Sequence, residues 1–272
     1  MLAVARNLWQ YRELMWTLAW KNISVRYKQA YLGIAWAVLK PVMLMLIFTL
    51  VKSFVGIESG PIPYPILTFA ALMPWVLFQE ATSEGINSVV SNAHLIRKIY
   101  FPREIFPLTT VLTKLFELGI NFIILAGMMW YFRMAPTVFV FWVPLIIAYT
   151  IICSLTVTLV GAAMNVYYRD VATALPVVLS LLMYASPVMY PLKLVQDKLL
   201  VHQAAGNWSN MLYTIYTMNP LAGIIDAFQR AMLHGTAPDF SVIWPGMIVV
   251  AMLFPLSYLL FKRAEAYFAD VI

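Results

Sequence analysis

The run MAPTVFVFWVPLIIAYTIICSLTVTLVGAAMNVYY, residues 134–168, carries no formal charge over 35 residues and decides the fold class of this chain. As an α-helix it would be about 52 Å long, because each residue adds about 1.5 Å. The hydrocarbon core of a bilayer is about 30 Å thick, so the run is long for one crossing and cramped for two crossings with a turn. We predict one membrane-spanning helix near residues 138–165.

The composition of the whole chain is that of an integral membrane protein. Of its 272 residues, 62% are hydrophobic and 11% are charged, whereas about 25% of the residues of an ordinary soluble domain are charged. The length allows several spans but no sizeable soluble domain, so we expect one membrane domain, 1–272. The single Cys153 excludes a disulfide framework and is interpreted as a core residue. The net charge of +6 is attributed to membrane topology, and no nucleic-acid partner is expected.

Five other apolar runs complete a predicted set of six spans. They are residues 32–51, 59–79, 106–131, 171–192 and 240–261. Spans 1 to 5 thus fall within 32–192, span 6 is 240–261, and 262–272 remains as a tail. Proline interrupts the last two runs, which membrane helices tolerate better than soluble helices do. The predicted fold class is an all-α integral membrane protein.

The distribution of Lys and Arg predicts the orientation of the spans. With six spans both termini lie on one side, and thirteen of the 18 basic residues fall on or near that side. The five on the opposite side are Lys52, Arg133, Lys193, Lys198 and Arg230. Because basic residues gather in cytoplasmic loops, we expect cytoplasmic termini. Two spans within 134–168 would instead place Arg169, Lys262 and Arg263 on the outer side of the membrane, so the charge distribution also favours a single span.

Residues 1–30 predict a cytoplasmic helix that lies in the membrane interface. Charged residues interrupt any signal-peptide core in this segment. At 100° per residue, one polar strip collects Gln10, Glu13, Thr17, Lys21 and Ser24. Trp9, Trp16 and Trp20 lie off this strip and suit the headgroup layer. The alternative is a packed first helix of a soluble segment.

Residues 193–238 predict a gate-like region on the outer side of the membrane. The segment is apolar but contains more His, Asn and Thr than a lipid-facing span would carry. Asn219 and Pro220 would end one short helix and begin another, giving helices near 207–218 and 221–234. Each helix would be roughly 18 Å long, too short to cross the bilayer, so re-entrant or surface-lying helices are expected. An ordinary folded external loop is the alternative.

The loop NAHLIRKIYFPREIFP, residues 92–107, concentrates Arg97, Lys98, Arg103 and Glu104 in eight positions. The predicted topology makes this loop cytoplasmic. The sequence contains no GxxxxGK[ST] phosphate-binding loop, so a pump built on this chain would need a separate ATPase.

Several separated segments resemble the permease subunits of ATP-binding-cassette polysaccharide exporters. They are RYKQAYLGIAWAVLKPVMLMLIFTLV (26–51), YPILTFAALMPWVLF (64–78), SNAHLIRKIYFPREIFP (91–107), NVYYRDVATALP (165–176), SPVMYPL (186–192) and MNPLAGIIDAFQRAMLHG (218–235). The resemblance implies a homodimer with two copies of an ATPase subunit that binds ATP and Mg, and no cofactor, metal or catalytic site in this chain. It also implies export of lipid-linked polysaccharide, such as O-antigen, capsule or teichoic acid, across the bacterial inner membrane.

The resemblance also assigns a coupling helix at 92–100, which would contact the ATPase. Asn92 would cap this helix, Leu95, Ile96 and Ile99 would face a groove of the ATPase, and the charged residues would form a polar rim. The full predicted coupling set is Asn92, His94, Leu95, Ile96, Arg97, Lys98, Ile99, Tyr100, Arg103 and Glu104. Arg169 and Asp170 match the short cytoplasmic turn of the family between spans 4 and 5.

A polysaccharide passage would use aromatic rings, because these stack on sugar rings while tolerating changes in the glycan. The candidates for the channel wall are Trp36, Phe48, Trp75, Phe78, Tyr184 and Tyr190, although packing against lipid explains each one equally well. Lys40 is the candidate for binding a lipid head group as it enters the passage. Asn219 and Pro220 are the candidates for the outer gate. Lys114 and Glu117 stand three apart on one helical face and are expected to pair.

Two other function classes remain as alternatives. A membrane-embedded enzyme acting on lipid-linked glycans would need a polar catalytic cluster, and His94, His202 and His234 are isolated in sequence. A proton-coupled transporter would need a deep carboxylate, for which Glu117 is the candidate, with Glu80 and Glu84 close to a span end.

Overall fold

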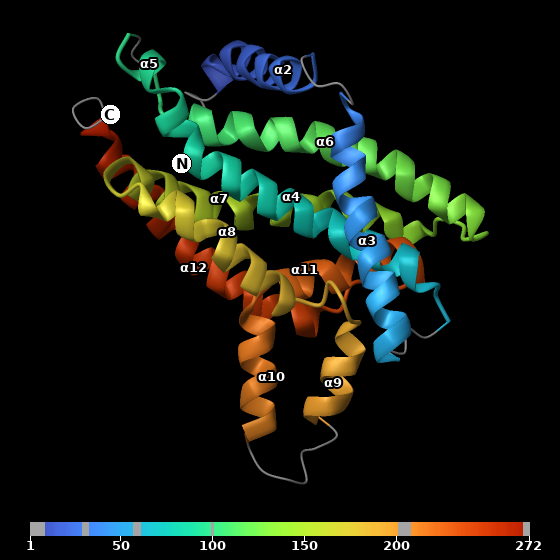
Figure 1. Cartoon of the computed structure of the whole chain (residues 1–272). Helices are drawn as coiled ribbons and strands as arrows, with labels where there is room; N and C mark the ends of the chain where they lie inside the picture. The colour runs from blue at the N-terminus through green and yellow to red at the C-terminus, as the bar shows by residue number, and fades with distance from the viewer. Residues whose placement is uncertain (1–8, 29–32, 57–60, 99–100, 201–207, 269–272) are drawn as a thin grey trace.

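The computed structural model of the chain describes residues 9–28, 33–56, 61–98, 101–200 and 208–268. These residues form helices and turns, with no strand among them (Figure 1). The elements are α2 (Arg12–Lys28), α3 (Ala35–Val55), α4 (Tyr64–Ser91), α5 (Ala93–Ile96), α6 (Ile105–Tyr131), the 3₁₀-helix η1 (Val138–Trp142), α7 (Val143–Tyr167), α8 (Asp170–Tyr184), α9 (Leu192–Leu200), α10 (Trp208–Met218), α11 (Pro220–Gln229), the π-turn η3 (Arg230–His234) and α12 (Phe240–Glu265).

Four of the described helices are long and apolar enough to cross a membrane. They are α3, α6, the continuous η1 and α7 helix from Val138 to Tyr167, and α12. The prediction of one continuous helix within 134–168 is therefore confirmed, and its crossing of the membrane stays a prediction. The other two predicted spans correspond to α4, which has 28 residues, and α8, an apolar helix of 15 residues. A total of six spans stays a prediction.

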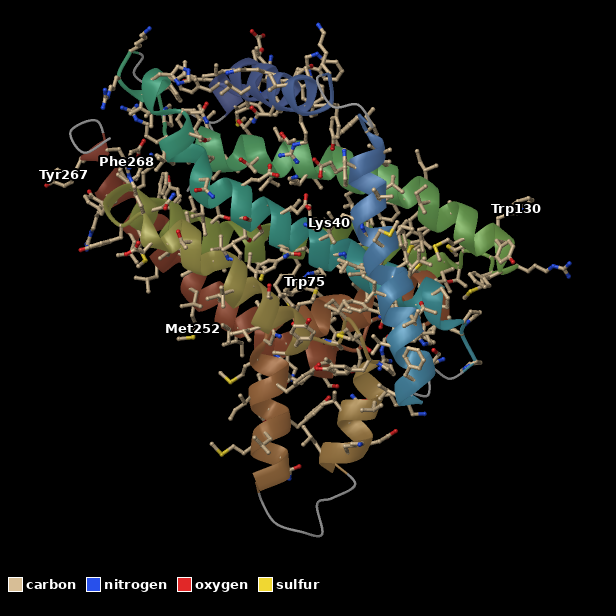
Figure 2. All side chains as sticks on the ribbon, in the orientation of Figure 1. Lys40, Trp75, Trp130, Met252, Tyr267 and Phe268 are labelled. Carbon is tan, nitrogen blue, oxygen red and sulfur yellow. The ribbon has the colours of Figure 1, made fainter. Side chains whose placement is uncertain are left out.

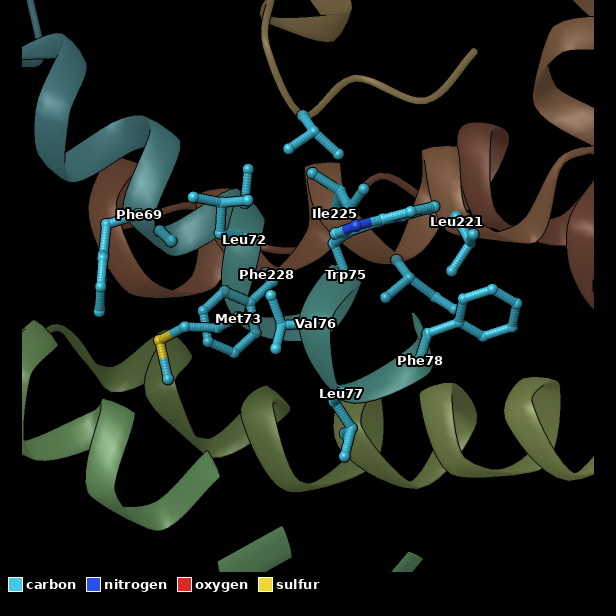
Figure 3. Packing of buried hydrophobic residues seen from close by; sticks show 14 of the residues in the cluster. Phe69, Leu72, Met73, Trp75, Val76, Leu77, Phe78, Leu221, Ile225 and Phe228 are labelled. Atoms are coloured by element: carbon cyan, nitrogen blue, oxygen red, sulfur yellow. The ribbon is translucent and has the colours of Figure 1, made fainter. Parts of the chain in front are cut away.

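Helix α4 is the central element of the bundle. It is buried along most of its length and packs against α7, α6, α3 and α11. Figure 3 shows Trp75 and Val76 of α4 interleaved with Leu221, Ile225 and Phe228 of α11. The first half of α4, residues 64–78, is almost entirely apolar, and such a stretch is expected at the centre of a bundle because it has no face to present to solvent.

Small residues bring α4 and α7 close together. A Cβ atom on Gly85 would lie 2.5 Å from Thr158 Cγ2, and one on Gly161 would overlap Ile86 Cδ1. Asn165 of α7 also donates a hydrogen bond from Nδ2 to the Ile86 carbonyl, at 3.2 Å. Close backbone approach at small residues is how membrane helices gain van der Waals contact. The pair α4 and α7 therefore forms the rigid centre on which other helices are placed.

The segment after α8 departs from the predicted span 171–192. Helix α8 ends at Tyr184, and α9 begins at Leu192. The break coincides with Pro187, which has no N–H to continue a helix and restricts the residue before it. Helix α9, which the sequence pattern did not predict, packs against α10, and both extend away from the main bundle (Figure 1).

The predicted helix break at Asn219 and Pro220 is confirmed. Helix α10 ends at Met218 and α11 starts at Pro220. The Asn219 Oδ1 accepts a hydrogen bond from the Leu221 N–H at 3.1 Å, and its Nδ2 donates to Ser186 Oγ at 2.9 Å. All residues of α11 from Leu221 to Gln229 are buried. Helix α11 is thus part of the core and does not lie on a surface.

Widening the contact between α4 and α7 is expected to destabilise the bundle. Gly161→Val should lower the free energy of unfolding by about 1–3 kcal/mol, because overpacked side chains force backbone shifts. Gly127→Val is the matched control, since a Cβ atom there meets nothing within 4 Å. Thermal unfolding in detergent measures both, and equal midpoints for the two variants would contradict the close packing.

Candidate functional site: a charged cluster and the loop after α4

Six charged side chains from four helices meet in one cluster. It consists of Arg26 on α2, Lys40 on α3, Glu80 and Glu84 on α4, and Lys114 and Glu117 on α6. Three cations face three carboxylates, so the formal charges cancel. Charges inside a membrane protein are expensive unless they are paired. The cluster meets this requirement through contacts between helices.

Lys114 lies at the centre of the cluster. Its Nζ is 2.7 Å from Glu80 Oε2, 2.7 Å from Glu84 Oε1 and 3.0 Å from Glu117 Oε2, and its side chain is 2% exposed. The predicted pair of Lys114 and Glu117 is therefore confirmed. The sequence pattern missed the two carboxylates of α4, which reach Lys114 because Glu80 and Glu84 are four residues apart and share a helical face.

Arg26 joins the N-terminal helix α2 to the cluster. One guanidinium nitrogen is 2.5 Å from Glu84 Oε1, and the other is 2.8 Å from Glu117 Oε1. Burial alone would lower the pKa of Arg26, but the hydrogen bond to Glu84 and the charges of Glu84 and Glu117 hold this pKa above its ordinary value. Helix α2 is thus tied to both α4 and α6 by one cation.

Lys40 joins α3 to the same cluster. Its Nζ donates to Glu80 Oε1 at 2.6 Å, where α3 crosses α4 (Figure 2). The side chain is 46% exposed, far more than that of Lys114. Lys40 was predicted to contact a lipid head group, and in the structure its ammonium group bonds a carboxylate of α4. A role in head-group entry stays a prediction.

The loop after α4 contains a shorter helix than the predicted coupling helix. Helix α5 has four residues, and Ile99 and Tyr100 lie outside the described residues. Asn92 is at the predicted N-cap position of α5, and its carbonyl accepts hydrogen bonds from the Leu95 and Ile96 N–H groups. Its side chain makes no capping bond, because Nδ2 donates to the Ser88 carbonyl at 2.8 Å. Asn92 therefore joins the end of α4 to the start of α5.

The side chains of the loop divide into exposed and inward-facing groups. His94, Arg97 and Lys98 are exposed, and Leu95 is half-buried. Ile96 is buried in a second core cluster with residues of α6, α7 and α12. Ile96 was predicted to face a groove of a partner; its side chain instead anchors the loop to this chain.

Arg103 and Glu104 are buried and do not form an exposed polar rim, contrary to the prediction. The Arg103 backbone N–H donates to Glu265 Oε1 at 2.8 Å, and Arg103 Nη1 donates to the Phe101 carbonyl at 2.5 Å. Glu104 Oε2 is 2.8 Å from Lys262 Nζ. These contacts join the start of α6 to the end of α12, because Lys262 and Glu265 lie in its last turn.

The predicted turn at Arg169 and Asp170 is present between α7 and α8. Both residues are exposed, and Asp170 begins α8. An acidic residue in the first turn suits the positive end of the helix dipole. The contact of this turn with an ATPase stays a prediction.

The aromatic candidates for a channel wall fall into two groups. Phe48, Trp75 and Phe78 are buried in the main core of this chain, so they have no free ring face for a polymer in this conformation. Trp36 and Tyr184 are exposed. Tyr190 is half-buried and donates its O–H to the Tyr184 carbonyl at 3.0 Å. Burial by neighbouring helices, which composition does not reveal, separates the two groups.

Apolar helices of membrane-spanning length, joined by a charge-balanced cluster and an exposed basic loop, define a helical membrane protein. The chain belongs to the ABC-2 type transporter family, whose model matches residues 13–233.

Relatives of this chain have names that refer to polysaccharide export. The chain is 26% identical over 274 residues to the O-antigen export system permease protein RfbA of Myxococcus xanthus, with 100% of both chains covered. It is 26% identical over 235 residues to a protein of the same name from Klebsiella pneumoniae, covering 85% of this chain and 84% of the relative. It is 24% identical over 258 residues to the polysialic acid transport protein KpsM of Escherichia coli, covering 90% and 92%.

Removing the central cation is expected to destabilise the bundle more than removing the exposed one. Lys114→Met should lower the free energy of unfolding by about 3–5 kcal/mol, because it leaves buried carboxylates without their shared partner. Lys40→Met, a matched change at a half-exposed site, should lower it by about 1 kcal/mol or less. Denaturant unfolding in micelles measures both, and equal losses would contradict the central position of Lys114.

Proposed function

We propose that this chain is the membrane-spanning subunit of an ATP-driven exporter of lipid-linked polysaccharide. The cargo is O-antigen-like or capsule-like and moves from the cytoplasmic to the outer face of the bacterial inner membrane. The observation that carries this proposal is the end-to-end correspondence with an O-antigen export permease, together with the family match over 13–233. The matching names of relatives from other bacteria add support.

The proposed assembly contains two copies of this chain and two copies of an ATPase subunit. The ATPase holds ATP and Mg, and this chain has no catalytic site. In the membrane, α4 and α8 add two crossings to the four apolar helices, giving six spans with both termini in the cytoplasm. The basic residues near the terminus-bearing side support this orientation.

The loop after α4 is proposed to receive the push of the ATPase. Arg97 and Lys98 are exposed on the surface of the loop, whereas the buried Ile96 side chain anchors the loop in the core. Glu104 links the start of α6 to Lys262 on α12. A displacement of α5 would therefore also move the ends of α4, α6 and α12.

The outward path is proposed to use exposed rings and the segment around α9 and α10. Trp36 and Tyr184 have free ring faces. Asn219 joins the protruding α10 to the buried α11, so it is the joint of the proposed outer gate. Lys40, half-exposed beside Glu80, is the proposed first contact for a phosphorylated lipid head group.

The proton-coupled alternative is not favoured by the geometry. It requires a carboxylate free to bind and release protons, and Glu80, Glu84 and Glu117 all contact Lys114. Each also contacts Arg26 or Lys40. These cations hold the carboxylates in ion pairs.

Reconstitution in proteoliposomes tests the proposed function. The chain and its neighbouring ATPase subunit are combined with lipid-linked polysaccharide, and transfer of the polymer across the bilayer is measured. ATP should drive transfer, and a proton gradient without ATP should not. Transfer driven by the gradient alone, or none with ATP for every lipid-linked polysaccharide of the source organism, would contradict the proposal.

Reversing the exposed charges of the loop is expected to uncouple the two subunits. Arg97→Glu with Lys98→Glu should weaken ATPase binding about tenfold or more, because like charges across an interface cost several kcal/mol. Lys193→Glu with Lys198→Glu on α9 is the matched control, with the same change in charge at exposed positions. Co-purification and ATPase stimulation measure the effect. Full stimulation of ATP hydrolysis by the loop variant would contradict the proposal and show that these charges only orient the chain in the membrane.

A further inference from the structure

Arg133 is an isolated charge at the far end of α6 from the charged loop. It is the sole charged residue between Glu117 and Arg169 in the sequence. Its side chain is exposed and forms no ion pair or hydrogen bond with the described residues. The cluster around Lys114 thus neutralises the buried charges of α6, whereas Arg133, just beyond the end of α6, is exposed and lies outside this cluster.

The backbone at Arg133 adopts a conformation that usually belongs to glycine. Its φ is 57°, and Arg133 is the one non-glycine residue with positive φ among the described residues. The Met134 N–H bonds the Met129 carbonyl at 2.8 Å, and the Arg133 N–H bonds the Trp130 carbonyl at 3.1 Å. This pattern is the Schellman ending of a helix, where the left-handed position favours Gly. An arginine in this backbone conformation suggests a role for its side chain, because the left-handed region costs a non-glycine residue free energy.

The same turn borders a hollow of about 460 Å³. Its walls are Met129, Trp130, Tyr131, Arg133, Met134 and Ala135. Trp130 is 84% exposed and Tyr131 is 77% exposed, and Figure 2 shows Trp130 projecting at the end of α6. Exposed Trp and Tyr at the end of an apolar span mark the headgroup layer of a bilayer. If α6 crosses a bilayer, these residues place the hollow at the depth of lipid phosphates.

The connection that follows Arg133 packs against the end of η3. Gly235, at the end of η3, has a φ of 62°, and a Cβ atom there would lie 2.8 Å from Thr137 Cγ2. Val138 and Phe141 of η1 are exposed apolar residues near the same end. The chain just after the hollow is thus in close contact with Gly235, and the exposed residues of η1 are apolar enough to enter the membrane interface.

We propose that this hollow, the Arg133 site, binds the phosphate of an anionic phospholipid in the leaflet that meets the C-terminal end of α6. The guanidinium group supplies charge and donors for phosphate oxygens. Trp130 and Tyr131 flank the glycerol region, and the half-buried Met134 offers flexible apolar contact to the acyl chains. The proposal depends on α6 crossing the membrane and not on the cargo, so its failure would leave the export proposal intact.

Lipid titration of the full chain tests the Arg133 site. The purified protein in detergent is titrated with phosphatidylglycerol or phosphatidylcholine, and native mass spectrometry counts bound lipids. Arg133→Ala should lose one phosphatidylglycerol binding event, with its affinity reduced about tenfold. Arg133→Lys should retain most of this affinity, because the charge remains. Phosphatidylcholine binding should not change.

Two further variants separate binding from folding. Arg133→Gly removes the side chain but suits the left-handed turn, so it should lose the lipid while unfolding at no lower a temperature than the wild-type chain. Lys193→Ala removes an exposed cation elsewhere and should bind phosphatidylglycerol like the wild type. Unchanged binding in Arg133→Gly, an equal loss in Lys193→Ala, or a dependence on Arg133 confined to a lipid-linked sugar phosphate would each overturn the proposal.

Discussion

The arrangement of this chain depends on the need to neutralise Lys114 inside a membrane bundle. Its side chain is almost fully buried, and three carboxylates from two helices surround its ammonium group. Each of these carboxylates also meets a cation from α2 or α3. One buried cation thereby fixes α4 against α6, and its partners place α2 and α3 around that pair. Apolar contacts alone give helices in lipid little such register, because lipid is as apolar as the side chains.

The charged cluster and the exposed loop are connected through α4 and α6. Helix α4 carries Glu84 in the cluster and continues to Asn92 at the loop, a separation of about 12 Å along the helix. Helix α6 begins at the loop and carries Lys114 and Glu117. From these two helices, ion pairs lead to α2 and α3, and the pair of Glu104 and Lys262 leads to α12. In the proposed exporter this connection would pass ATPase motion to the membrane helices.

Local patterns in the sequence predicted the features that depend on local physics. The uncharged run at 134–168 predicted one long helix, and Asn219 with Pro220 predicted the break between α10 and α11. The spacing of Lys114 and Glu117 predicted their pairing. The basic loop was also located correctly between α4 and α6.

The features that the sequence did not reveal depend on contacts between distant segments. Nothing in the periodicity of α4 shows that Glu80 and Glu84 meet Lys114, because a helical pattern gives a face but not its partner. The sequence pattern predicted that Arg103 and Glu104 form an exposed polar rim, but in the structure they contact Glu265 and Lys262 of α12. Trp75 is an aromatic residue of the kind expected in a channel wall, yet neighbouring helices cover it completely. The contacts and burial of such residues can be determined only from the three-dimensional structure.

A double-mutant cycle between Arg26 and Glu84 tests most directly whether the cluster ties α2 to the bundle. Arg26→Gln, Glu84→Gln and the double variant are compared by their free energies of unfolding in micelles. The account predicts that the two changes interact by about 1 kcal/mol or more, as residues in one ion-pair network do. Additive effects, within about 0.5 kcal/mol, would contradict it and leave α2 held by apolar contacts alone.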